Sequence, residues 1–197
     1  MKYIYFAIAT TGLDEIYDDI IKLSLLIEEE GNVLVKRCYN IKPRKGTKPS
    51  QLNQQTLDFN GVTIEQLREF RDPKETSDRL AEVLKEYSNN GIDKLIVVGH
   101  NNKFDSCFID RFLARYQGYF RSKYLVTSYD VDIMKVAPFV EFHTGIKFKD
   151  YKLRTLTNYF NLEYDTTDIN TKLNCIREIN RMFKDLDKIK MLGKLEK

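Results

Sequence analysis

The sequence predicts an α/β domain built on a mixed β-sheet of five strands with helices on its faces. Three apolar, β-rich segments follow one another at the N-terminus, and the turn between the second and third is short, which is typical of antiparallel strands. Further along the chain, amphipathic helical segments alternate with strand segments, and this alternation adds parallel strands covered by helices. The 197 residues favour a single domain over 1–197, with a frayed tail from about residue 191.

The three N-terminal strands are expected over 2–9, 20–29 and 33–41. The dipeptide Gly31-Asn32 between the second and third strands predicts a hairpin turn. The first strand is apolar enough to lie at the centre of the sheet. It ends in FAIATTGLD, residues 6–14, where a polar turn follows two alanines that face the same side of the strand.

Two helices follow a polar loop over 42–56. The first begins after Asn60-Gly61 with Thr63 as its N-cap, and Pro73 ends it. The second runs over 77–90 with Ser77 as its cap.

A near-continuous apolar run over 94–99 predicts a central strand that is covered on both faces. The remaining expected elements are a helix over 102–116, a strand over 124–131, a helix over 151–160 and a long helix from about Tyr164 into the 180s.

Composition argues against a membrane protein and against a disulfide-stabilised one. No stretch of about 18 apolar residues occurs, so no membrane span is expected, and the N-terminus has the pattern of a first strand rather than of a signal peptide. The three cysteines are odd in number and far apart, which favours free thiols in a reducing, cytoplasmic compartment. The basic clusters over 36–48 and 181–197 suit contacts to phosphate, although each cluster alone also fits a solvated surface.

Six segments carry a resemblance to a known family. They are FAIATTGLD (6–14), YNIKPRKG (39–46), FNGVTIEQL (59–67), VVGHNNKFDSCFIDR (97–111), DIMKVA (132–137) and YKLRTLTNYFNLE (151–163). In this order and spacing they resemble the motifs of the DnaQ-like 3′–5′ exonucleases of the DEDD superfamily. The resemblance covers nearly the whole chain and implies an RNase H-like fold.

The resemblance also implies a function and a metal site. Members of this family are metal-dependent exonucleases that release nucleoside monophosphates from single-stranded 3′ ends. Four carboxylates in their active site hold two Mg²⁺ or Mn²⁺ ions. Asp105 and Asp168 match two of these metal ligands. The other two positions are Ala7 and Ala9, so we expect this chain to bind nucleic acid and to cleave it poorly or not at all.

Two accounts of the alanines stay open. Both ligands can have been replaced in an otherwise active enzyme, which the intact TTGL flank after Ala9 favours. Alternatively, the chain is a natural pseudo-exonuclease that serves as a module for binding nucleic acid or protein. The expected partner is a single-stranded DNA or RNA 3′ end, and no feature identifies a polymerase or another protein partner.

The last motif distinguishes two branches of the family. One branch has a His five residues before the final Asp, and the other has a Tyr four residues before it. No histidine follows His143, whereas Tyr164 precedes Asp168 by four residues, a spacing that places both on one face of a helix. The match therefore assigns Tyr164 to orienting the attacking water, while a one-turn shift would select Asp165 or Asn170 instead.

The resemblance also points to residues that would hold the substrate. Thr10, Thr11, Gly12 and Leu13 are expected around the 3′-terminal nucleotide, and His100 and Asn101 are further candidates. His100 is expected to have a structural role or to contact the substrate rather than to act as a base.

Further acidic and aromatic residues lie near these motifs in the sequence. Asp132 is interpreted either as a group supporting the site or as a helix cap, and Asp14, Asp18 and Asp19 as solvated. Phe104 is expected to pack in the core rather than to stack on a base.

Overall fold

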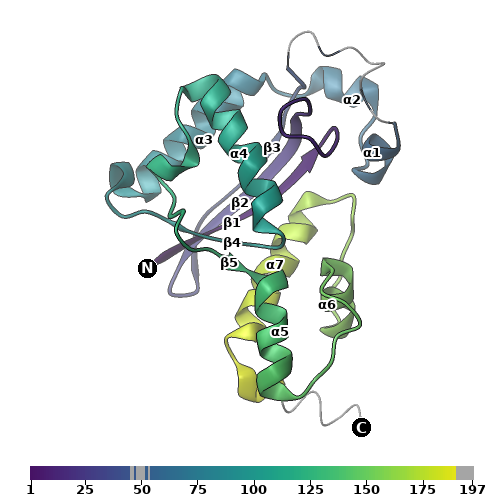
Figure 1. The fold of residues 1–197 in the computed structure, drawn as a ribbon. Coiled ribbons are helices and arrows are strands. Elements are labelled where there is room, and N and C mark those ends of the chain that lie inside the picture. Colours follow the sequence, from purple (N-terminus) through teal and green to yellow (C-terminus); the bar gives the residue numbers. More distant parts are fainter. Residues whose placement is uncertain (45–46, 48–51, 53, 190–197) are drawn as a thin grey trace.

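The computed structural model describes residues 1–44, 47, 52 and 54–189. Its centre is a five-stranded sheet with the order β3-β2-β1-β4-β5 (Figure 1). The strands are β1 (Lys2–Thr10), β2 (Ile20–Glu29), β3 (Asn32–Asn40), β4 (Ile96–Gly99) and β5 (Val131–Asp132). The first three pair antiparallel, whereas β4 and β5 run parallel to β1. The predicted mixed sheet, with the first strand at its centre, is confirmed.

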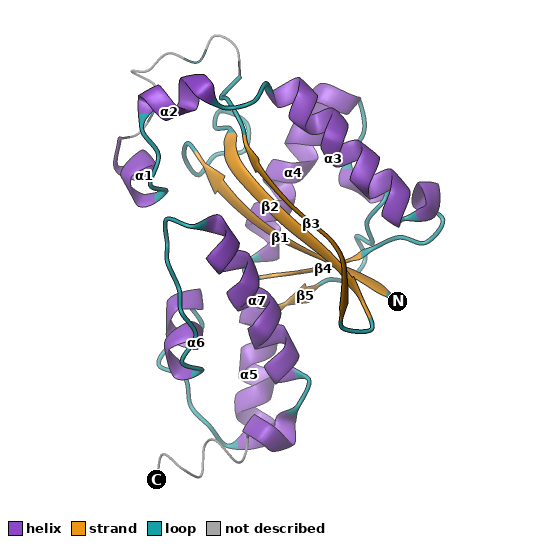
Figure 2. Cartoon of the chain, turned by 180° about the vertical axis from the view of Figure 1, so that it is seen from behind, coloured by secondary structure: helices purple, strands orange, loops and turns teal. Residues whose placement is uncertain are grey.

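Helices cover both faces of this sheet, as Figures 1 and 2 show. They are α1 (Gln54–Phe59), α2 (Ile64–Glu69), α3 (Pro73–Tyr87), α4 (Asn102–Gln117), α5 (Ile133–Thr144), α6 (Leu153–Tyr159) and α7 (Ile169–Phe183). Helices α3 and α4 lie against one face, and α5 and α7 against the other.

Strand β1 separates two hydrophobic cores because successive side chains of a strand point to opposite faces. Ile4, Phe6 and Ile8 pack with α3 and α4. Tyr5, Ala7 and Ala9 belong to the second core, together with buried residues of α5 and α7. Ala7 and Ala9 therefore face the same helices, and this is the geometry that the sequence predicted for them.

Capping residues explain where the helices begin. Thr63 caps α2 as predicted, since its hydroxyl accepts from the Gln66 amide and the Gln66 side chain accepts from the Thr63 amide. The prediction that Ser77 starts the next helix is wrong. Helix α3 begins at Pro73, a residue that is favoured in the first helical turn, and the Asp72 carboxylate caps it.

The second half of the structure differs from the prediction in two elements. The strand expected over 124–131 is reduced to Val131–Asp132 and one isolated bridge between Leu95 and Leu125, because the chain from Leu125 to Val131 is longer than the stretch from Leu95 to Val98 that it faces and cannot stay paired along its length. Helix α5, which follows directly, was not predicted although Ile133, Ala137 and Val140 have helical spacing and are buried.

The remaining sequence predictions concern the cysteines, membrane spans and the chain end. Cys38, Cys107 and Cys175 are free thiols. No helix in the described part of the chain is long and apolar enough to cross a membrane. The frayed tail predicted from about residue 191, and parts of both basic clusters, lie outside the described residues.

Candidate functional site

A pocket of about 400 Å³ opens where β1 and β4 end and where α4 and α7 begin. This is the edge of an α/β sheet at which ligands commonly bind. Its volume is within the range of about 300–1,000 Å³ that is usual for small-molecule sites. The lining residues are Ile8, Ala9, Lys22, Phe59, Asn60, His100, Asn101, Phe104, Asp105, Met134, Lys152, Leu153, Tyr164, Thr166, Thr167, Ile169 and Lys172.

Asp105 is the one carboxylate among these lining residues. It lies in the first turn of α4 and is only 5% exposed. Burial raises the pKa of Asp105 to about 6, and Lys172 acts in the opposite direction. Its Oδ2 atom has no hydrogen-bond partner among the described residues, which is unusual for a buried polar atom and typical of a position that meets a ligand.

Of the two alanines, Ala9 lines the same pocket as Asp105, and Ala7 does not. Ala7 is fully buried. Neither side chain has a polar atom, so β1 contributes to the pocket only methyl groups and backbone at these positions.

Two lysines that the sequence analysis did not select surround Ala9. Lys22 is the direct cross-strand partner of Ala9 on β2, so both side chains lie on the same face of the sheet. Its Nζ donates to Asn60 O at 2.7 Å and to Thr167 O at 3.1 Å. Burial lowers the pKa of Lys22, and the charge of Asp168 acts in the opposite direction. Lys172 reaches across from α7, and its Nζ donates to Ile8 O at 3.4 Å.

These residues do not form the ligand set of a two-metal site. Magnesium and manganese prefer oxygen ligands, and a protein commonly supplies one or two carboxylates for each ion beside water and substrate phosphate, so a two-metal site needs more than one carboxylate. The pocket instead presents three lysines and one carboxylate. Within residues 1–44, 47, 52 and 54–189, no group of three or more His, Cys, Asp and Glu side chains is arranged to hold a metal ion. The Mg²⁺ or Mn²⁺ ions that the resemblance implies therefore do not fit the residues present.

Asp168 has a structural role at the edge of the pocket. It is the N-cap of α7, and its Oδ1 accepts from the Asn170 amide at 2.8 Å. Its neighbours Thr167 and Ile169 line the pocket, whereas Asp168 does not. Helix α7 begins only at Ile169, so the predicted helix start at Tyr164 is wrong.

Tyr164 reaches the pocket from the loop that precedes α7. The prediction that Tyr164 and Asp168 share one helical face is wrong, because Asp165 folds this segment into a turn by accepting from the amide and hydroxyl of Thr167, both at 2.8 Å. Burial raises the pKa of Tyr164. Its phenol therefore enters the pocket as a neutral donor or acceptor.

His100 and Asn101 line the pocket at the end of β4. His100 Nε2 lies 2.8 Å from Tyr151 O, and burial lowers the pKa of this imidazole. The amides of Asn101 and Asn102 donate to Asp132, whose carboxylate also caps α5. Of the two interpretations of Asp132, the helix cap is confirmed.

The predicted 3′-end loop lies next to the pocket but does not line it. Thr10 Oγ1 donates to Gly12 O at 2.5 Å, and Thr11 Oγ1 donates to Asp18 at 3.0 Å. A Cβ atom on Gly12 would collide with the Asp18 carboxylate, so a larger residue there requires the Asp18 side chain to move. Leu13 is 84% exposed.

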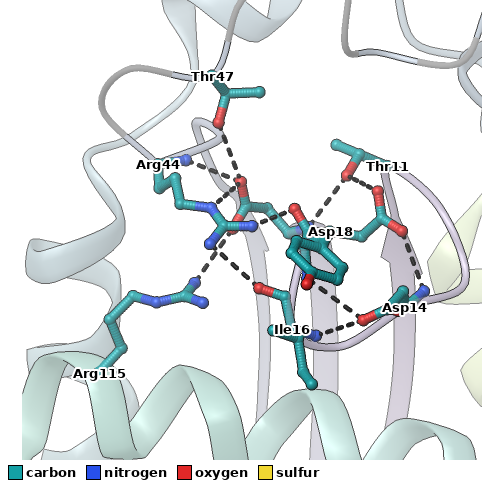
Figure 3. Close-up of polar contacts among 9 residues, drawn as sticks. Thr11, Asp14, Ile16, Asp18, Arg44, Thr47 and Arg115 are labelled. Carbon is teal, nitrogen blue, oxygen red and sulfur yellow. Dashed lines mark hydrogen bonds and ion pairs between the residues drawn. The ribbon is translucent and has the colours of Figure 1, made fainter.

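A buried ion-pair network anchors the far end of this loop (Figure 3). Asp19 is 6% exposed, so the prediction that it is solvated is wrong. Its carboxylate lies 3.1 Å from Arg44 Nε and 3.2 Å from Arg115 Nη1 on α4. Arg44 also donates to the carbonyls of Ile16 and Tyr17. The network ties the loop after β1 to the chain that leaves β3 and to α4.

No family model matches the sequence. The chain is 31% identical over 160 residues to "DNA polymerase III PolC-type" of Listeria innocua, which covers 81% of this chain and 10% of the relative. It is 29% identical over 111 residues to "Ribonuclease T" of Hahella chejuensis, which covers 52% of this chain and 49% of the relative. The chain thus spans about a tenth of the length of the PolC-type relatives.

The fold matches that of exonuclease I. The crystal structure of E. coli exonuclease I in complex with a dT13 oligonucleotide superimposes with a TM-score of 0.78 over 95% of this chain and 42% of that chain, at 15% identity. A zinc-bound E. coli ExoI–ssDNA complex gives a TM-score of 0.75 over 95% of this chain and 42% of that chain, at 14% identity. The RNase H-like fold is confirmed, and the sequence similarity supports the resemblance to DnaQ-like exonucleases.

Proposed function

We propose that this chain is a DnaQ-like exonuclease domain that holds the 3′ end of a single-stranded nucleic acid in the pocket and does not hydrolyse it. One observation carries the proposal: three lysines and a single carboxylate line the pocket, and the two strand positions where the resemblance implies carboxylates are alanines. Three cationic side chains attract a phosphate backbone. One carboxylate, that of Asp105, is not enough to hold two metal ions.

Of the two accounts of the alanines, the pocket favours the natural pseudo-exonuclease. Replacement of two ligands in an active enzyme would leave the other two carboxylates in place and would add no cation. Here Lys172 extends to the backbone between Ala7 and Ala9, and replacement of the two ligands does not explain this cation. Asp168 remains next to the pocket, where it caps α7 and its charge acts on Lys22.

The similarities support a nucleic-acid ligand. One structural neighbour is exonuclease I in complex with a single-stranded oligonucleotide, and one relative in sequence is named ribonuclease T. We therefore propose DNA or RNA single strands as ligands, with the strand end in the pocket.

A residual hydrolase is the competing function, because Asp105 and Tyr164 both line the pocket. The test uses end-labelled single-stranded DNA and RNA of equal sequence, with Mg²⁺ or Mn²⁺. We expect retention of both strands in a binding assay and no release of mononucleotides. Release of labelled mononucleotides by the purified chain would establish the hydrolase instead.

Preference for an end is tested with a linear and a circular single strand of the same length. We expect tighter binding of the linear strand, because only it can place a terminus in the pocket. Affinity should fall with salt, with a log-log slope of about −0.7 for each phosphate that is neutralised. Absence of binding to either strand would reject the proposal and leave a protein-binding module.

A further inference from the structure

We propose that the ammonium of Lys172 takes the place of the metal ions that the resemblance implies, so that the pocket binds a nucleotide phosphate directly and without a divalent cation. The inference rests on the proposed function and specifies how the same pocket recognises its ligand. It follows from the position of Lys172, the hydrogen bonds of Lys22 and the unpaired oxygen of Asp105.

Lys172 reaches the backbone between Ala7 and Ala9, the two positions where the resemblance implies carboxylates. It is the fourth residue of α7, and its side chain crosses to β1, where Nζ donates to Ile8 O at 3.4 Å. Ile8 is the residue between Ala7 and Ala9. A carboxylate at either alanine position would pair with this ammonium. The two methyl groups do not, so the positive charge of Lys172 remains available to a ligand in the pocket.

Lys172 and Lys22 each keep at least one N–H donor that can bind a ligand. An ammonium group has three N–H donors. In the described part of the chain, Lys172 uses one donor, on Ile8 O, and Lys22 uses two, on Asn60 O and Thr167 O. Two donors of Lys172 and one of Lys22 are therefore free to meet phosphate oxygens, and all three are charge-assisted.

Asp105 supplies the complementary acceptor. Its Oδ2 is buried, lines the same pocket and has no partner among the described residues. A nucleotide offers phosphate oxygens as acceptors and a sugar hydroxyl as a donor. It can therefore satisfy the lysines and Asp105 together, which a simple anion without a hydroxyl cannot.

The charge balance favours an anion over a divalent cation. Among the residues that line the pocket, Lys22, Lys152 and Lys172 outnumber Asp105, while the charge of Asp168 acts on Lys22 and that of Asp132 acts on Asp105 from outside the lining. The fixed ammonium of Lys172 repels a metal ion at this place and attracts a phosphate. Lys152 is 82% exposed at the side chain and lies 3.8 Å from Asp150, so it contributes at the rim.

The test measures binding of the mononucleotides dTMP and AMP and of a ten-residue single strand by titration calorimetry, in EDTA and in Mg²⁺. We expect mononucleotide affinity in EDTA to equal that in Mg²⁺ within about twofold. Lys172→Met should lower it on the order of 10- to 100-fold, the range for losing hydrogen bonds to a charged group. Lys172→Arg should retain most of the affinity, because it keeps the charge.

The matched control is Lys85→Met, which removes an exposed lysine of α3 outside the pocket and outside both basic clusters and should leave mononucleotide affinity unchanged. Thermal melting establishes that each variant is folded. Mononucleotide binding that requires Mg²⁺, or that survives Lys172→Met unchanged, would overturn the inference while binding of the ten-residue strand still supports the proposed function. Failure of the unaltered chain to bind either ligand would reject both.

Discussion

Restoring the two carboxylates of the first motif should not by itself create a metal site. We consider the variant Ala7→Asp with Ala9→Glu, in which both new side chains would face α7 beside Lys172. An ammonium in reach of two carboxylates pairs with them and neutralises part of their charge. The double variant is therefore expected to bind Mn²⁺ weakly, and the triple variant that also carries Lys172→Ala is expected to bind it more tightly.

The size of the difference follows from the charges. Two unit charges 4 Å apart interact with about 4 kcal/mol at an effective dielectric constant of 20, and a divalent ion doubles this repulsion. The Lys172 side chain is flexible and its ammonium can move away from the ion, so only part of this energy is retained. We expect a loss of about 1.4–2.8 kcal/mol, which is a 10- to 100-fold weaker affinity for Mn²⁺ in the double variant.

The assay is calorimetric titration of Mn²⁺ into the unaltered chain, the double variant and the triple variant. Circular dichroism and thermal melting establish that the variants fold, which matters because Ala7 is fully buried. The control is the same pair of carboxylates with Lys188→Ala, which should bind Mn²⁺ as weakly as the double variant. Equal Mn²⁺ affinity in the double and triple variants would show that Lys172 does not occupy the metal position.

Three further outcomes concern stability. Asp19→Asn should lower the free energy of unfolding by about 1–3 kcal/mol in urea denaturation, because it leaves Arg44 and Arg115 without their buried partner, and a change below about 0.5 kcal/mol would contradict the anchoring role. Asp72→Ala should cost about 1 kcal/mol through loss of the α3 cap, and an unchanged urea midpoint would show that α3 does not depend on it. The pKa of Asp105 is raised to about 6 in the folded state, so stability should fall as pH rises from about 4 to 6 and then level off. Asp105→Asn should remove this fall, and a pH profile identical to that of the unaltered chain would contradict the burial effect.

Local sequence patterns predicted the sheet order near its centre. The alternating segments of β1, β2 and β3 and the turn at Gly31-Asn32 specify an antiparallel meander, because both the register and the buried face follow from the period of two. The Thr63 cap is likewise local, since its partners lie within three residues. Interactions among a few neighbouring residues determine these elements, so they can be predicted from the sequence.

Other local elements were missed for specific reasons. Helix α5 has the apolar spacing of a helix, but Pro138 interrupts its pattern, and packing against α7 and the sheet stabilises it. The turn at Asp165 delays the start of α7 because an Asp side chain competes with helical hydrogen bonds.

The sequence by itself determined the fold class, the resemblance to DnaQ-like exonucleases and the pair of alanines that face one side of β1. The place of Lys22 opposite Ala9 comes from the pairing of β1 with β2, whose register the long loop over 11–19 does not fix locally. Only the tertiary structure decided what surrounds those alanines. Lys172 follows Ile8 by 164 residues in sequence, and their contact arises because α7 packs across β1. The charge of a pocket is the sum over side chains from distant segments, so its sign is fixed only when the chain folds.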